Sequence, residues 1–181
     1  MLKSIFAKYV FAFMLIILSS FLVIILIISL IIGNYSEEAK SDIMENSARA
    51  TSTYIEGLFS HSAVNRIEDV ISAEGEQARS MLRVISASSD DVTILVSDNE
   101  GKIVLAVGRS ADDVDTGAVI PNALMDEVNS GREITRGGTI EGIFDTTHYT
   151  YAVPVYNSDS AVCGTVFNVI YGNESSGLNV K

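Results

Sequence analysis

The chain has 181 residues, of which 48% are hydrophobic and only 19% charged, and its formal net charge is −11 at pH 7. This acidity excludes a strong phosphate-binding surface, so nucleic acid is not an expected partner. The single cysteine, Cys163, excludes an intrachain disulfide bond and a zinc site built from cysteine pairs. The length allows one domain of ordinary size and an additional segment.

The additional segment is an apolar block near the N-terminus, residues 9–32, which contains no charged side chain. A helix of this length rises about 36 Å and can cross a hydrocarbon core of about 30 Å. The block therefore predicts a transmembrane helix, with the membrane as a partner. A cleaved signal peptide is the alternative, but its apolar core usually has only about 7–15 residues. A pilin-like N-terminus is disfavoured because the apolar run lacks the expected processing glycine and nearby glutamate.

The distribution of charge predicts the orientation of this helix. Lys3 and Lys8 are the only basic residues before the block, and all 23 acidic residues follow it. Because positively charged flanks stay on the cytoplasmic side, we expect a cytoplasmic tail at residues 1–8 and an extracytoplasmic remainder. The protein would then cross the plasma membrane once. The remainder carries a net charge of −13, which suits a cationic ligand.

Helical periodicity extends from Ser36 to Ser88. A first stripe with 4-3-4-3-4 spacing consists of Met44, Ala48, Thr51, Ile55, Leu58 and Ser62. So narrow a stripe is typical of a helix that pairs with another helix. Residues 33–62 are therefore predicted to form a helical stalk. The side chains predicted to pair two protomers in a homodimer are Met44, Ala48, Ile55 and Leu58.

A second stripe with the same spacing predicts a helix of the domain core. It consists of Ile67, Ile71, Glu74, Ala78, Met81 and Ile85, and it is widened by Val70 and Leu82. The phase slips by one residue between the two stripes, beside Gly57 and the polar residues 60–62. We therefore expect either two helices or one kinked helix.

From Val92 onwards, apolar residues alternate with a period of two, which predicts strands. The expected strands are residues 92–97, 102–107, 132–136, 139–144 (the weakest), 149–155 and 161–171. The second of these is apolar on both faces, so it is expected to lie in the centre of a sheet. A short helix is expected at residues 122–129, and Gly137-Gly138 is expected to form a turn. Long helices followed by strands predict an α+β fold with the helices packed on an antiparallel sheet.

Several of these features together resemble a known family. Besides the N-terminal span and the helical stalk, the similar residues are the turn with its following strand at 97–104 (SDNEGKIV), Ile120-Pro121, Gly131, the strand at 151–155 (YAVPV) and the run at 164–167 (GTVF). The combination resembles the extracytoplasmic sensor region of bacterial sensor histidine kinases. The resemblance implies a PAS-like fold of the Cache/PDC type, with long helices on a five-stranded antiparallel sheet at residues 63–172.

The resemblance also implies a function in signal transduction. Such receptors continue through a second transmembrane helix into a cytoplasmic kinase, whereas this chain ends at Lys181, after a C-terminal segment at residues 173–181. We therefore expect an N-terminal fragment of a two-component sensor histidine kinase, without enzyme activity of its own. The alternative is a free-standing, membrane-anchored binding or structural module without cytoplasmic output.

No catalytic residues, metal site or cofactor are predicted. His61 lacks the acidic residue and the proline that follow the phosphoacceptor histidine of kinases. Asp112, Asp113 and Asp115 lack the spacing of a calcium-binding loop and are expected to be solvated. Cys163 begins a strand and is expected to be a small core residue.

Four residues are candidates for binding a small-molecule ligand. In the resembled fold, ligands lie between the sheet and the loops that cross it, which here would be residues 108–145 over the face that carries Tyr149 and Tyr151. Arg132 and Arg136 could hold an anionic group through bidentate hydrogen bonds. The alternative is that both tyrosines are half-buried sheet residues and both arginines are solvated.

Overall fold

The computed structural model describes residues 3–62, 64–90, 92–140, 143–144 and 148–171. It divides into two compact units, Met1–Lys40 and Ser41–Lys181. Helix α1 (Lys3–Ser60) contributes residues to both units. The division between the units therefore falls inside the segment predicted as a stalk, residues 33–62, rather than at its end.

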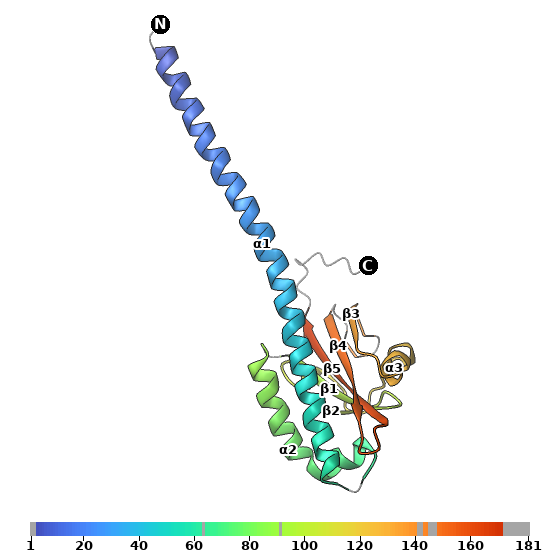
Figure 1. Ribbon diagram of the computed structural model, residues 1–181. Helices are drawn as coiled ribbons and strands as arrows, with labels where there is room; N and C mark the ends of the chain where they lie inside the picture. The colour runs from blue at the N-terminus through green and yellow to red at the C-terminus, as the bar shows by residue number, and fades with distance from the viewer. Residues whose placement is uncertain (1–2, 63, 91, 141–142, 145–147, 172–181) are drawn as a thin grey trace. The chain divides into compact units, whose positions relative to one another are not determined.

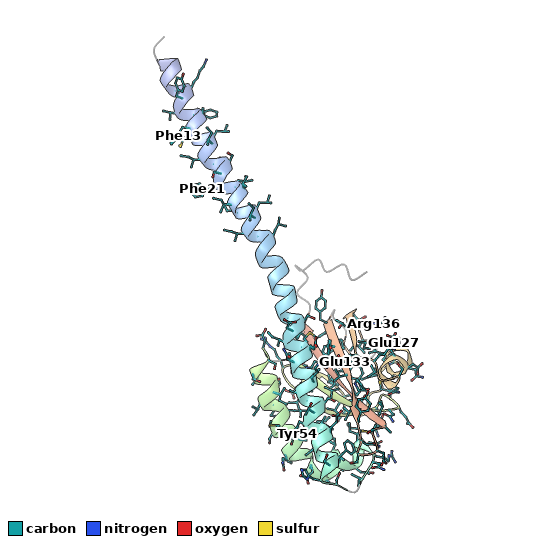
Figure 2. The ribbon with its side chains drawn as sticks, viewed as in Figure 1. Phe13, Phe21, Tyr54, Glu127, Glu133 and Arg136 are labelled. Carbon is teal, nitrogen blue, oxygen red and sulfur yellow. The ribbon has the colours of Figure 1, made fainter. Side chains whose placement is uncertain are left out.

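In the first unit, α1 contains a segment that is long and apolar enough to cross a membrane. This segment is Ala7–Leu30, with 24 residues and a mean hydropathy of 3.2, and none of it is buried inside the protein. Large apolar side chains such as Phe13 and Phe21 project from it (Figure 2). The bounds differ by two residues from the predicted span at residues 9–32, and the length is the same.

The second unit is built on one five-stranded antiparallel sheet with the strand order β2-β1-β5-β4-β3. The strands are β1 (Thr93–Asp98), β2 (Ile103–Val107), β3 (Ile134–Gly138), β4 (His148–Tyr156) and β5 (Val162–Tyr171). Residues 41–60 of α1 and helix α2 (Ile67–Ser88) cover one face of the sheet, and helix α3 (Asn122–Asn129) lies on the other (Figure 1). The predicted α+β, PAS-like fold is confirmed.

The face of the sheet under α1 and α2, which we call the helix side, holds the larger apolar core. Alternate residues of each strand point to it, as the period of two requires. The strand residues of this core are Ile94, Val96, Leu105, Val107, Tyr151, Val153, Val155, Cys163 and Val166. The core residues of α2 are Ile67, Val70, Ile71, Ala78, Leu82 and Ile85.

The opposite face, which we call the loop side, has a second apolar core. It is covered by α3, by the short 3-10 helix Ala111–Asp113 and by the loops around them. The buried strand residues there include Leu95, Ala152 and Phe167, and Met125 and Val128 contribute from α3. Both faces of the sheet are therefore buried, and so the strands read as nearly continuous apolar runs.

The structure corrects the predicted role of the stripe along α1. Met44, Ala48 and Ile55 are 4%, 0% and 0% exposed, and Leu58 packs beside them against the helix-side core. The periodicity was read correctly, but the surface that these four residues contact is the sheet of the same protomer. A buried stripe cannot also bind a partner helix, so these side chains do not form a dimer surface in this fold.

Three predictions about the strands are also corrected. The strand at residues 102–107, expected in the centre, is the edge strand β2. It is apolar on both faces because α2 covers one side and the 3-10 segment covers the other. Gly137 and Gly138 belong to β3 instead of forming a turn. The weak strand predicted at residues 139–144 is wrong, because Ile143 and Phe144 donate hydrogen bonds to the carbonyl of Ile140, as in a turn.

The second stripe is confirmed as the face of α2 that packs in the core, apart from Glu74 and Met81, which are exposed. At Glu74 the backbone leaves the helical region (φ −114°, ψ 16°), which kinks the helix beside Gly75. Beyond the kink, Ala78, Leu82 and Ile85 are buried as predicted, whereas Met81 is 43% exposed.

Candidate functional site

Successive residues of strand β4 face opposite sides of the sheet. Tyr149, Tyr151 and Val153 contact the helix-side core, whereas Ala152 belongs to the loop-side core. Successive side chains of a strand point to opposite faces, so His148 and Thr150 lie on the loop side with Ala152. The prediction that Tyr149 and Tyr151 face the crossing loops is therefore wrong: they face α1 and α2.

The loop side carries a group of buried polar residues that are not among the predicted site residues. We call them the loop-side polar residues; they are Thr93, Ser97, His148, Thr150 and Thr165, and each is at most 3% exposed. Cross-strand partners share a face, and Ser97 pairs with Thr165 across β1 and β5. His148 and Thr150 alternate with Tyr149 and Tyr151 in the sequence, and this alternation indicates that they lie on the opposite face of the strand.

The contacts of these residues connect the sheet to its cover. The Thr93 hydroxyl accepts a hydrogen bond from the backbone N–H of Ser110, at 3.0 Å. The ring of His148 stacks on Phe144, with the ring centres 4.3 Å apart. The Thr165 hydroxyl is buried without a hydrogen-bond partner among the described residues. A ligand that replaced part of the cover would find polar groups on an otherwise apolar floor, as in most small-molecule sites.

The two arginines of the predicted site lie apart from this floor and are exposed. Arg136 extends from β3 on the loop side and forms an ion pair with Glu127 of α3, beside it in Figure 2. Arg132 hydrogen-bonds the Ser130 hydroxyl through its Nε, at 3.0 Å. Arg136 is therefore close to the loop-side layer, but its guanidinium already has an acidic partner.

On the helix side, Tyr151 belongs to a charged network with α1. Its hydroxyl donates a hydrogen bond to Oε2 of Glu133, at 2.7 Å. The same oxygen accepts a hydrogen bond from Nη2 of Arg49, also at 2.7 Å, and Arg49 in turn pairs with Glu45. Burial, with the hydrogen bond to Glu133, raises the pKa of Tyr151 to about 12. The phenol therefore stays protonated and continues to donate.

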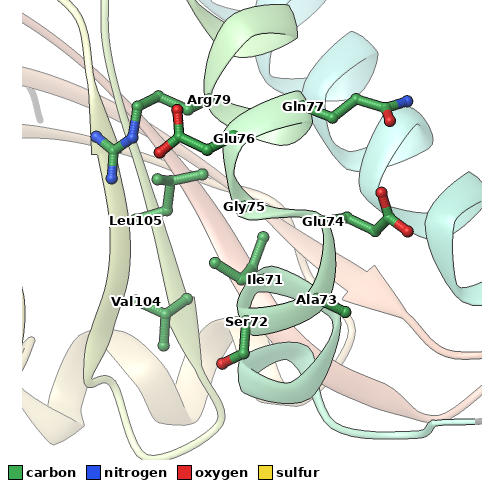
Figure 3. Close-up of a pocket in the computed structure, with 10 residues that line it drawn as sticks. All are labelled: Ile71, Ser72, Ala73, Glu74, Gly75, Glu76, Gln77, Arg79, Val104 and Leu105. Carbon is green, nitrogen blue, oxygen red and sulfur yellow. The ribbon is translucent and has the colours of Figure 1, made fainter.

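A groove of about 530 Å³ lies at the kink of α2, on the helix side near the edge strand β2. Its floor is apolar, with Ile71, Val104 and Leu105, and its rim includes Glu76 and Arg79 (Figure 3). Arg79 donates a hydrogen bond to the carbonyl of Ala106 in the edge strand, at 3.4 Å. The groove lies at the β2 edge of the sheet, whereas the predicted ligand-binding residues lie at the opposite edge, near β3 and β4. Its size is within the range of small-molecule sites.

Asp112 is exposed in the 3-10 helix that follows β2, Asp115 is exposed just after that helix, and His61 is exposed just after α1. Within the part of the chain that the structure describes, no three histidine, cysteine, aspartate or glutamate side chains come together in a way that could hold a metal ion.

Cys163 is a core residue, as predicted, and its thiol is expected to be unreactive in the folded protein. Burial raises the pKa of Cys163 from 9.0 to about 12. We expect a maleimide to leave the native protein unmodified at neutral pH and to label it once it is unfolded in urea. Because the folded state holds this proton more tightly, Cys163 also contributes stability that is lost as the pH rises from about 9 towards 12. Rapid labelling of the native protein would contradict the buried position.

Among the comparisons with known proteins, solved structures match this chain, and they support the fold. No family model and no curated protein matches the sequence. Among solved structures, the sensory domain of the Campylobacter jejuni chemoreceptor Tlp3 with isoleucine bound matches with a TM-score of 0.54 and 17% identity, over 77% of this chain and 54% of that one. The Escherichia coli DcuS sensor domain matches with a TM-score of 0.50 and 12% identity, over 74% of this chain and 92% of that one.

A third structure, an extracellular ligand-binding receptor from Desulfohalobium retbaense, matches with a TM-score of 0.51 and 13% identity, over 76% of this chain and 23% of that one. This chain spans about half the length of the Tlp3 domain and nearly all of the DcuS domain. At these identities the likeness establishes the fold alone, which this chain shares with the Tlp3 sensory domain and the DcuS sensor domain.

Proposed function

We propose that the chain is the signal-sensing input region of a membrane receptor, with its sheet domain outside the cytoplasm. The observation that carries the proposal is the combination of a sensor-domain fold with an apolar, membrane-length segment in the same helix, α1. The flanking charges favour a cytoplasmic N-terminus. We propose that the output is generated by another part of the same receptor.

We propose further that the receptor is a two-component sensor histidine kinase of which this chain is an N-terminal fragment. The resemblance of residues 97–104 and 151–155 to such kinases supports this. The alternative is a membrane-anchored binding or structural module without output. Fusing the chain to the cytoplasmic part of a known receptor kinase would separate the two, because only an input domain would alter the phosphorylation of the regulator.

The ligand that we propose is a small polar molecule held on the loop side. The loop-side polar residues support this, and the Tlp3 sensory domain, of similar fold, has been seen with isoleucine bound. Amino acids are therefore the first class to test. A cationic ligand remains a second candidate because of the net charge of −13 that follows the apolar block.

The test is a thermal-shift screen of the full chain in detergent micelles with the common amino acids. A ligand at about 100 times its Kd should stabilise the fold by about 2.7 kcal/mol and raise the melting temperature visibly. Thr150→Val keeps the shape of the buried side chain but removes its hydroxyl, so it should weaken that shift. Ser72→Ala, in the groove at the kink of α2, is the matched control. A shift that depends on Ser72 and not on Thr150 would contradict the loop-side site.

We also propose that the chain forms a homodimer, through a surface of α1 other than the predicted stripe. The side of α1 that faces away from the sheet carries small exposed residues, among them Ala50, Thr53 and Gly57. Their 3-4 spacing matches a helix-pairing seam. Anchoring in a membrane would also raise the local concentration of two protomers.

A further inference from the structure

We propose that Glu133 couples the loop-side layer of the domain to helix α1. Glu133 directly precedes β3, and its carboxylate holds both Arg49 of α1 and Tyr151 of β4, each at 2.7 Å. Of the ion pairs among the described residues, one joins α1 to a residue outside that helix, and it is the pair between Arg49 and Glu133. The proposal deepens the proposed function, since it names a route by which a loop-side change would reach α1.

Strand β3 is suited to carry such a change. It is an edge strand, hydrogen-bonded on one side to β4. Of its five residues only Ile134 is buried, and the next three are exposed. Few buried contacts are typical of elements that move at low cost in free energy. A shift of β3 would therefore disturb little of the core.

The middle of β3 and the residue just before it connect to different layers. Arg136, within β3, pairs with Glu127 of α3 on the loop side. Glu133, three residues earlier, pairs with Arg49 on the helix side. Figure 2 shows Glu127 and Arg136 together near α3, and Glu133 below them toward α1. A displacement of α3 that pulls Arg136 would therefore move the carboxylate that holds α1.

The other hydrogen bonds between α1 and the sheet do not depend on the position of β3. The Asn168 side chain donates a hydrogen bond to the carbonyl of Met44, Ser52 donates one to the carbonyl of Pro154, and Glu56 accepts one from the backbone N–H of Tyr156. All three reach the central strands β4 and β5, each of which is paired on both sides. These contacts hold α1 in place, whereas the contact with Glu133 follows the position of β3.

The test is a double-mutant cycle read by hydrogen–deuterium exchange of the full chain in micelles, without any ligand. Glu133→Gln should raise the exchange of backbone amides in residues 44–58 of α1 by roughly three- to tenfold and leave those of residues 78–86 in α2 unchanged. Arg136→Gln should also raise exchange in α1. In the Glu133→Gln background the second substitution should add nothing, because the link is already broken.

Three results would overturn the proposal. Arg136→Gln could leave α1 unchanged, or it could act equally in both backgrounds, which would show two independent contacts. Glu133→Gln could also accelerate α1 and α2 alike, which would show a general loss of stability. Glu45→Gln is the matched control, because it removes a charge beside Arg49 without a contact to β3. The cycle requires no ligand, so its failure would leave the proposed sensing function untouched.

Discussion

Replacing Ile55 by aspartate is expected to unfold the sheet domain. Ile55 is 0% exposed and lies in the helix-side core between α1 and the sheet. A carboxylate there has no basic partner in the apolar core, and burying an unpaired charge costs several kcal/mol. That cost is comparable to the whole stability of an ordinary domain, about 5–15 kcal/mol. Far-UV circular dichroism during heating would show the loss of the cooperative transition.

The matched control is Ser80→Asp, on the exposed side of helix α2. Substitutions on such a surface usually change stability by less than about 0.5 kcal/mol, so this variant should melt like the unmodified protein. If Ile55→Asp instead folded normally and lost only self-association, the stripe with Met44 and Leu58 would be a dimer surface after all, and the packing described here would be wrong.

Replacing Gly164 by alanine is expected to destabilise the sheet by about 3 kcal/mol, the upper part of the usual range for overpacking. An added Cβ would lie 2.4 Å from the carbonyl oxygen of Ser97 and 2.7 Å from Cδ1 of Ile67. The first contact is with backbone of the neighbouring strand β1, which cannot rotate away. Either β5 must shift or α2 must lift, and urea denaturation would report the lower midpoint.

Gly57→Ala is the control, and it is expected to change the free energy of unfolding in the opposite direction. Gly57 lies within α1, and its added Cβ would meet no atom within 4 Å. Alanine is favoured over glycine in a helix by about 1 kcal/mol, so this variant should be more stable than the parent. Equal effects of the two substitutions would show that the close approach of β5 to Ser97 and Ile67 is absent.

The sequence was sufficient to predict the fold because the signals were local. The apolar block predicted the membrane-length helix, and the alternation from Val92 predicted the four strands with buried cores to within two residues at their starts. The helix at Asn122–Asn129 was predicted with its observed bounds. Turn residues and periodicity determine these elements almost without tertiary contacts.

What could not be predicted were the partners of each element. The stripe with Ile55 has the same spacing whether it meets a second helix or a sheet, so its interpretation as a dimer surface failed. The edge position of β2 was hidden because its two faces are both covered. The faces of Tyr151 and His148 depend on which side of β4 meets α1, and a sequence pattern with a period of two does not specify that choice.

The central claim, an anchored sensor domain outside the cytoplasm, can be tested most directly by the accessibility of single cysteines in intact cells. Cys163→Ala would serve as background for two variants, Glu100→Cys in the exposed turn between β1 and β2, and Lys8→Cys at the start of the apolar segment. A membrane-impermeant maleimide should label position 100 in intact cells and position 8 only after permeabilisation. Labelling of position 100 only after permeabilisation would place the sheet domain in the cytoplasm and contradict the account.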